Sequence, residues 1–209
     1  MAFSRQDTEC MALALKLSKK GRALVGANPM VGCVITRDDK IIAQDYHRQY
    51  GKSHAEVNAL NQIKDQAKSA KLYVTLEPCS HQGKTPPCTK ALIKAGIKKV
   101  VVAMLDPNPM VSGRGVKLLK DAGIEVEIGL LQSEAMELNR GFVKRMETGM
   151  PFVTTKIAMS LDGGTAMGSG ESQWITSDTA RLDVQKLRSN NQAIMTGSGT
   201  IINDNPKMT

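Results

Sequence analysis

Hydrophobic and polar positions follow two different periods along the first part of the chain. Between residues 4 and 20 the apolar side chains recur at roughly helical spacing, with Ser4 as a candidate cap, and Gly21 ends the run. Residues 31–36 and 41–46 are rich in β-forming side chains and flank four polar residues, which predicts a hairpin. The chain is therefore predicted to begin with a helix followed by a β-hairpin.

Strand-like and helix-like segments alternate after the hairpin. The predicted strands are residues 72–76, 100–104 and 125–128, and the predicted helices are residues 54–66, 88–95 and 116–122. A further helix is expected to end near Thr148. This alternation is typical of an α/β fold, in which helices cover both faces of a sheet.

The pattern changes near Pro151, where we place a domain boundary. Residues 1–150 are then one domain, and residues 151–209 begin a second one. This second segment is only as long as a fragment of a typical domain. The pattern of this second segment predicts a strand from residue 152, a glycine-rich loop over 162–170, a helix over 177–188 and a strand over 193–195.

Charge is distributed unevenly between these two parts. The net charge is +8, and residues 1–150 hold 23 Lys and Arg against 15 Asp and Glu, whereas residues 151–209 hold five of each. A basic surface suits either a nucleic acid or a small phosphorylated ligand. Three Phe, three Tyr and one Trp provide little for a base-stacking platform, so a small phosphorylated substrate is favoured.

No apolar run approaches the roughly 18 to 20 residues that a membrane span requires. The first residues also lack the apolar core of a secretory signal, so we expect a cytoplasmic location and no membrane partner. In that compartment four cysteines favour metal binding or free thiols over disulfides. Cys10 and Cys33 lie in apolar contexts and are interpreted as small buried side chains without a role in chemistry.

Three other residues have the composition and order of a catalytic zinc site. Such a site takes three protein ligands and leaves the fourth position to water, and His54, Cys79 and Cys88 supply that set. His-x-Glu followed by Pro-Cys and a second Cys is the signature of zinc deaminases. His54 and Cys88 are expected at helix starts, where side chains project off the helix end. Glu56 is expected to move protons without binding the metal.

Two plainer interpretations of these residues remain open. Ser53 and Glu56 also have the spacing of a capping box, in which the glutamate only bonds the backbone of the cap residue. The two cysteines could instead belong to a four-ligand structural zinc site with His81 or Cys33. That second interpretation would describe a non-enzymatic zinc module.

Eight residues separate Cys79 from Cys88, where nucleoside and nucleic-acid deaminases commonly have two. The segment carries His81, Lys84 and Thr85, polar side chains able to hold a ring edge and a phosphate. Its plainer interpretation is a solvated loop made rigid by two prolines. A base deaminase of nucleic acid, such as a transfer RNA, or of a nucleoside is the rival enzymatic function.

Further motifs run in one order from Gly21 to Thr209. They are Asn28-Pro29, Val31-Gly32-Cys33-Val34-Ile35, His54-Ala55-Glu56, Thr75-Leu76-Glu77-Pro78-Cys79-Ser80-His81, Thr85-Pro86-Pro87-Cys88, Asp106-Pro107-Asn108-Pro109, Gly113-Arg114-Gly115, Ser160-Leu161-Asp162-Gly163 and Gly170-Glu171-Ser172-Gln173-Trp174-Ile175-Thr176. Together they resemble the family of bifunctional riboflavin-biosynthesis deaminase/reductases.

The resemblance implies a cytidine-deaminase-like, three-layer α/β/α domain over residues 1–150. This domain would use Zn²⁺ to deaminate a diaminopyrimidinone that bears a ribosylamino 5′-phosphate, and nucleic acid would not be a partner. Lys84 would meet the phosphate. The other matching positions are Asn28, His47 and His81 near the pyrimidine and ribose, and Asp106 and Asn108 on the loop that closes the pocket.

The resemblance also implies that residues 151–209 begin a dihydrofolate-reductase-like α/β domain, which reduces the ribosyl group to ribityl with NADPH. The matching positions are Ala158, Trp174, Thr200 and Asp204 for the cofactor, and Ser172 and Arg188 for the substrate. A homo-oligomer is implied as well. Because this second domain is incomplete, we expect the 209 residues as they stand to deaminate but not to reduce.

Overall fold

The computed structural model describes residues 3–109 and 111–208. The chain divides into two compact units, Met1–Phe152 and Val153–Thr209, and each is described by itself. None of the helices in the described part of the chain is long and apolar enough to cross a membrane.

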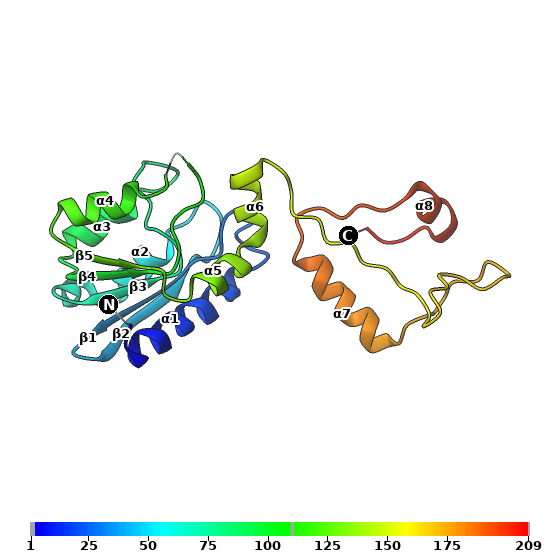
Figure 1. Cartoon of the computed structure of the whole chain (residues 1–209), viewed down its shortest axis with the longest axis horizontal. Coiled ribbons are helices and arrows are strands. Elements are labelled where there is room, and N and C mark those ends of the chain that lie inside the picture. Colours follow the sequence, from blue (N-terminus) through cyan, green and yellow to red (C-terminus); the bar gives the residue numbers. More distant parts are fainter. Residues whose placement is uncertain (1–2, 110, 209) are drawn as a thin grey trace. The chain divides into compact units, whose positions relative to one another are not determined.

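A mixed five-stranded sheet forms the centre of the first unit (Figure 1). Its strands are β1 (Gly32–Arg37), β2 (Lys40–Tyr46), β3 (Lys71–Val74), β4 (Lys99–Val102) and β5 (Glu125–Ile128), in the spatial order β2-β1-β3-β4-β5. β1 is antiparallel to both of its neighbours, and β3, β4 and β5 are parallel. The predicted hairpin is confirmed, and its turn residues Asp38 and Asp39 both have positive φ (48° and 60°), as tight hairpin turns require.

Helices cover both faces of this sheet. One hydrophobic core contains side chains of α1 (Arg5–Ser18), α5 (Gln132–Leu138) and α6 (Arg140–Thr148). The other contains side chains of α2 (Ala55–Ile63), α3 (Cys88–Lys94) and α4 (Arg114–Asp121). Short 3₁₀ helices, Lys19–Gly21 and Lys64–Ala67, follow α1 and α2. The α/β fold with three layers that the sequence predicted is confirmed.

The two cores follow from the alternation of side chains along the strands. Leu72 and Val74 point into the core that α2 shares, while Tyr73 between them points into the core that α1 shares. In β4, Val100 and Val102 point into the core that α2 shares, while Val101 between them points into the core that α1 shares. Successive side chains of a strand point to opposite faces, so an apolar run can serve both layers. Cys33 and Cys10 are buried in these cores, as the sequence predicted.

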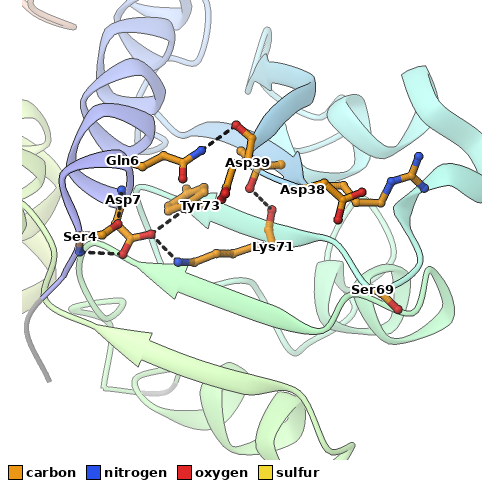
Figure 2. A pocket seen from close by; sticks show the side chains of 10 residues that line it. Ser4, Gln6, Asp7, Asp38, Asp39, Ser69, Lys71 and Tyr73 are labelled. Atoms are coloured by element: carbon orange, nitrogen blue, oxygen red, sulfur yellow. Dashed lines mark hydrogen bonds and ion pairs between the residues drawn. The ribbon is translucent and has the colours of Figure 1, made fainter.

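A partly buried ionic cluster links α1 to the start of β3 (Figure 2). Ser4 caps α1 in a reciprocal capping box with Asp7. The Asp7 carboxylate also pairs with Lys71 and accepts a hydrogen bond from the Tyr73 hydroxyl (2.8 Å). Burial alone raises the pKa of Asp7, but the hydrogen bonds from Lys71, Ser4 and Tyr73 hold it well below its usual range. A cavity of about 210 Å³ beside the cluster is lined by these four residues together with Gln6, Ser69 and residues 36–39.

The helix predicted to end near Thr148 is α6, and the short α5 precedes it. Asn139 lies between them and is buried. Its side chain accepts a hydrogen bond from the Met30 amide (2.8 Å) and donates one to the Met30 carbonyl (3.0 Å). This pair fixes the segment that follows Asn28 against the α5–α6 junction.

The second unit confirms one predicted element and corrects two. α7 (Asp178–Ser189) corresponds to the helix predicted over 177–188, and Ser177 caps it by accepting from the Ala180 amide. α8 (Ser198–Asp204) was not predicted. The strands expected from residue 152 and over 193–195 are wrong, because no strand occurs among the described residues 153–208. A strand requires a hydrogen-bonded neighbour, and neither segment has one there.

Candidate metal centre and active site

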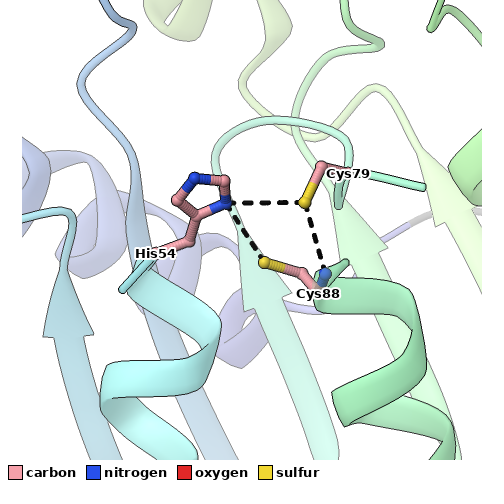
Figure 3. A group of neighbouring side chains, drawn as sticks. All are labelled: His54, Cys79 and Cys88. Carbon is pink, nitrogen blue, oxygen red and sulfur yellow. Dashed lines mark hydrogen bonds between the residues drawn. The ribbon is translucent and has the colours of Figure 1, made fainter. Parts of the chain in front are cut away.

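Three predicted ligands converge at the ends of elements that are distant in sequence (Figure 3). His54 directly precedes α2, Cys88 is the first residue of α3, and Cys79 lies in the loop after β3. His54 Nδ1 is 3.5 Å from Cys79 Sγ and 3.2 Å from Cys88 Sγ. The candidate ligand atoms of all three residues lie within 4.8 Å of one another.

The loop from Cys79 to Cys88 closes on itself, which explains why the two sulfurs meet. The Cys88 amide donates to Cys79 Sγ (3.2 Å), and the Thr89 amide and hydroxyl both donate to the Cys79 carbonyl (3.2 Å each). Pro87 directly precedes α3. Hydrogen bonding from Cys88, and then from His54, lowers the pKa of the Cys79 thiol, so a thiolate is accessible there.

The donor set and its spacing fit zinc. Zinc bonds of about 2.0 to 2.3 Å in a tetrahedron place neighbouring ligand atoms about 3.6 Å apart, close to the observed separations. Neither alternative fourth ligand joins the group: Cys33 is buried in the sheet core and His81 is exposed. The described residues therefore offer three ligands, which leaves one coordination position for water or substrate.

Glu56 lies beside this group in the first turn of α2 and is only 3% exposed. Its Oε2 has no hydrogen-bond partner, and no capping-box hydrogen bond joins it to Ser53 within the described part of the chain. Burial raises the pKa of Glu56 to about 7. A buried carboxyl oxygen without a partner indicates a ligand or water at this position.

His47 supplies a second unpartnered buried atom. Its Nδ1 donates to the Ser53 carbonyl (3.2 Å), and its Nε2 has no partner. Its ring stands edge-on to His54, with centroids 5.2 Å apart. Burial lowers the pKa of His47, which favours a neutral ring with Nε2 free to accept a hydrogen bond.

The other predicted substrate residues lie on loops around the same end of the sheet. Lys84 is exposed, and its Nζ lies 4.1 Å from the centroid of the Tyr50 ring. Asp106 and Asn108 follow β4, and the Asn108 amide donates to Asp106 Oδ1 (2.9 Å). Because β3 and β4 are parallel neighbours, the loop that follows β4 emerges at the same edge as Cys79. Asn28 is half-buried, two residues before the Met30 anchor.

The predicted reductase residues lie in the second unit, where α7 and α8 bury none of their residues. Thr200 and Asp204 are one turn apart on α8, and Arg188 on α7 donates to the Lys207 carbonyl (3.0 Å). Trp174 is exposed, and the central carbon of the Arg181 guanidinium lies 4.3 Å from the centroid of the Trp174 ring. Ala158 and Ser172 are half-buried. Among the described residues no side-chain hydrogen bond or ion pair joins any two of these six positions.

Three further side chains were not singled out from the sequence. Glu77 and Asn139 hold loops at the site, and Tyr50 lies against Lys84. Glu77 carried a recognisable signal, since a charged residue stands at the end of an apolar strand two positions before Cys79. No sequence signal distinguishes Tyr50 or Asn139.

An α/β sandwich in which one histidine and two cysteines meet at the starts of two helices defines the class of cytidine-deaminase-like zinc-binding domains. Residues 4–104 match the family model for the cytidine and deoxycytidylate deaminase zinc-binding region, and residues 151–209 match that for the RibD C-terminal domain.

Relatives with both regions are similar along nearly the whole chain. The riboflavin biosynthesis protein RibD of Escherichia coli (strain K12) is 55% identical over 204 residues, 98% of this chain and 56% of that protein. Among solved structures, Acinetobacter baumannii RibD superposes with a TM-score of 0.95 at 54% identity, covering 98% of this chain and 57% of the other. A deaminase/reductase from Thermotoga maritima gives 0.92 at 42% identity, covering 98% and 59%.

The chain belongs to the RibD family of riboflavin biosynthesis proteins. It spans slightly more than half the length of these relatives.

Proposed function

We propose that the first unit is a zinc-dependent hydrolase that deaminates 2,5-diamino-6-(5-phosphoribosylamino)pyrimidin-4(3H)-one, a step of riboflavin biosynthesis. The observation that carries the proposal is the convergence of His54, Cys79 and Cys88 beside the buried, unpartnered Glu56 Oε2. The name of the Thermotoga relative, a diaminohydroxyphosphoribosylaminopyrimidine deaminase, supports this substrate.

In this proposal His54 Nδ1 and the sulfurs of Cys79 and Cys88 hold zinc. When bound, zinc supplies the nucleophile by making water more acidic. Glu56 would take one proton of that water and give it to the ring nitrogen next to the attacked carbon. It would then pass the proton of the resulting hydroxyl to the departing amine, as the C–N bond breaks and the carbonyl forms. Glu56 is buried beside the proposed ligands with one oxygen unpartnered, which suits a carboxyl group that must both accept and return a proton there. One water is consumed and one ammonia is released.

The surrounding loops would select the substrate. The neutral His47 ring presents Nε2 to accept a hydrogen bond from the bound substrate. Lys84, held against the face of Tyr50, would meet the 5′-phosphate. Asn28, in the segment before β1, and His81, in the loop between Cys79 and Cys88, would contact the pyrimidine and ribose. Asp106 and Asn108 would contact the substrate from the loop after β4. The excess of basic residues in the first part of the chain is consistent with a phosphorylated substrate.

For residues 151–209 we propose a part in the reductase activity named for the Thermotoga relative, with NADPH as hydride donor. Ala158, Trp174, Thr200 and Asp204 are the proposed cofactor contacts, and Ser172 and Arg188 the proposed substrate contacts. The match of this segment to the RibD C-terminal domain supports the assignment.

Ammonia release from three candidate substrates tests the proposed deamination. The phosphoribosylaminopyrimidine, cytidine and a transfer RNA are each supplied to the zinc-loaded protein under identical conditions. We expect release from the first alone. Release from cytidine or the transfer RNA at a comparable kcat/KM would contradict the proposed substrate class.

A further inference from the structure

Glu77 is a buried carboxylate that the proton chemistry does not use. It follows β3 and precedes the candidate ligand Cys79 by two positions, and it is 4% exposed. Its backbone amide donates to the Met104 carbonyl (3.0 Å), which links the segment after β3 to the one after β4. A buried charge requires compensation, and Glu77 obtains it from backbone amides.

Four amides of the segment that follows β4 donate to this single carboxylate. Oε2 accepts from Asp106 (3.2 Å) and Gly113 (2.9 Å), and Oε1 accepts from Gly115 (2.8 Å) and Val116 (3.1 Å). The first two donors are the two ends of the loop that contains Asn108. The last two lie in the first turn of α4, so Glu77 also caps this helix from another part of the chain.

The local sequence of α4 is suited to this contact. Its own N-cap residue, Gly113, is left-handed (φ 76°) and makes no side-chain capping bond. A Cβ on Gly115 would lie 2.1 Å from the Pro78 carbonyl oxygen and 3.1 Å from Glu77 Oε1, so only glycine permits the approach. The helix start is therefore packed directly against the residues that lead to Cys79.

We infer that Glu77 is a positioning residue for the deamination, which fixes the proposed substrate residues Asp106 and Asn108 relative to the proposed ligand Cys79. The inference rests on the proposed function of these residues. Asp106 donates its own backbone amide to Glu77, and its side chain accepts from the Asn108 amide, so both substrate residues are held through one carboxylate. Charge-assisted hydrogen bonds of this kind are the strong ones in proteins.

Glu77→Gln tests the inference in the full chain. The amide keeps one accepting oxygen but turns an NH₂ group toward two of the four donors. We expect KM for the phosphoribosylaminopyrimidine to rise about tenfold or more, kcat to change less than threefold, and zinc to remain at one per chain. Amide hydrogen exchange over residues 106–116 should accelerate, while exchange in β3 stays unchanged.

Asp7→Asn is the matched control, because it removes a buried carboxylate that is bonded at the opposite end of β3. It should lower stability without changing KM. An equal rise of KM in both variants, or an unchanged KM in Glu77→Gln, would refute the positioning role. Glu77→Asp keeps the charge but shortens the side chain, so its KM should lie between those of the unsubstituted protein and Glu77→Gln. If the Gln variant does not fold, an unchanged KM in Glu77→Asp would refute the positioning role. If the unsubstituted protein releases no ammonia, the proposed function fails and this role fails with it.

Discussion

His54 and Glu56 lie two positions apart at the start of α2, yet the structure gives them different surroundings. His54 turns its Nδ1 toward two sulfurs, while Glu56 is buried with one oxygen unpartnered. Side chains two apart in a regular helix point in nearly opposite directions. His54 precedes the helix and Glu56 is in its first turn, so both reach the same site.

Glu56→Gln should therefore separate metal binding from proton transfer. The variant keeps the three proposed ligands, so zinc content should stay at one per chain. Deamination should fall by roughly 10²- to 10⁴-fold, because an amide cannot relay protons. Steady-state ammonia release and metal analysis on one preparation check both halves. Turnover close to that of the unsubstituted protein would show that another group moves the protons.

Lys84→Ala should weaken binding of the phosphorylated substrate by roughly ten- to a hundredfold, since a hydrogen bond to a charged group contributes about 1.5 to 3 kcal/mol. The control is Lys90→Ala, which removes an exposed charge from α3. The measurement compares KM for the substrate with and without its 5′-phosphate. A loss of the same size on both substrates would exclude a phosphate contact.

At the scale of elements, the sequence pattern located all five strands and most helices of the first unit, because most of these elements place apolar side chains at regular positions facing a core. The cluster of His54, Cys79 and Cys88 was predicted from the order of the His-x-Glu and Pro-Cys motifs along the chain. The roles of Asn139 and Glu77 were not predicted, although Glu77 lies in a quoted motif, since each residue holds a segment more than 25 residues away in sequence. The expected strands of the second unit rested on the local pattern of residues alone, and a strand forms only where a neighbouring strand accepts its hydrogen bonds.

The anchoring of α1 to β3 predicts a pH-dependent contribution to stability. The pKa of folded Asp7 lies below its unfolded value of about 3.9, so its contribution is complete above that value and is lost as the pH falls through the folded pKa. Asp7→Asn should lower the free energy of unfolding by about 1.5 to 3 kcal/mol at neutral pH, and the difference should shrink below pH of about 4.

Denaturant unfolding at pH 7 and pH 3 measures the Asp7 contribution. Glu9→Gln, which removes an exposed ion pair of the same helix, serves as the control and should have no measurable effect at either pH. A difference for Asp7→Asn that stays constant down to pH 3 would show that the carboxylate charge does not stabilise α1.

At the scale of the whole molecule, the buried apolar side chains of the described residues all lie between Cys10 and Val143. Large apolar side chains of the second unit, including Leu161 and Met195, are exposed. The first unit thus has its own two cores, which is what independent folding requires.

Limited proteolysis should therefore cleave the 209-residue chain first within residues 153–208 and leave a zinc-containing fragment ending near Phe152. Ammonia release per zinc by that fragment should match that of the whole chain, because the proposed metal ligands and Glu56 all lie in the first unit. Loss of ammonia release on cleavage would show that the deamination site needs the second unit.

The most direct test of the zinc-dependent deamination is a titration of metal-free protein with zinc, followed by ammonia release from the phosphoribosylaminopyrimidine. The proposed site predicts that the rate rises in proportion to bound zinc and levels off at one zinc per chain, and that Cys79→Ser neither binds zinc stoichiometrically nor gains activity. Full turnover by the metal-free protein, or full zinc occupancy in Cys79→Ser, would contradict the assignment of His54, Cys79 and Cys88 as the catalytic metal site.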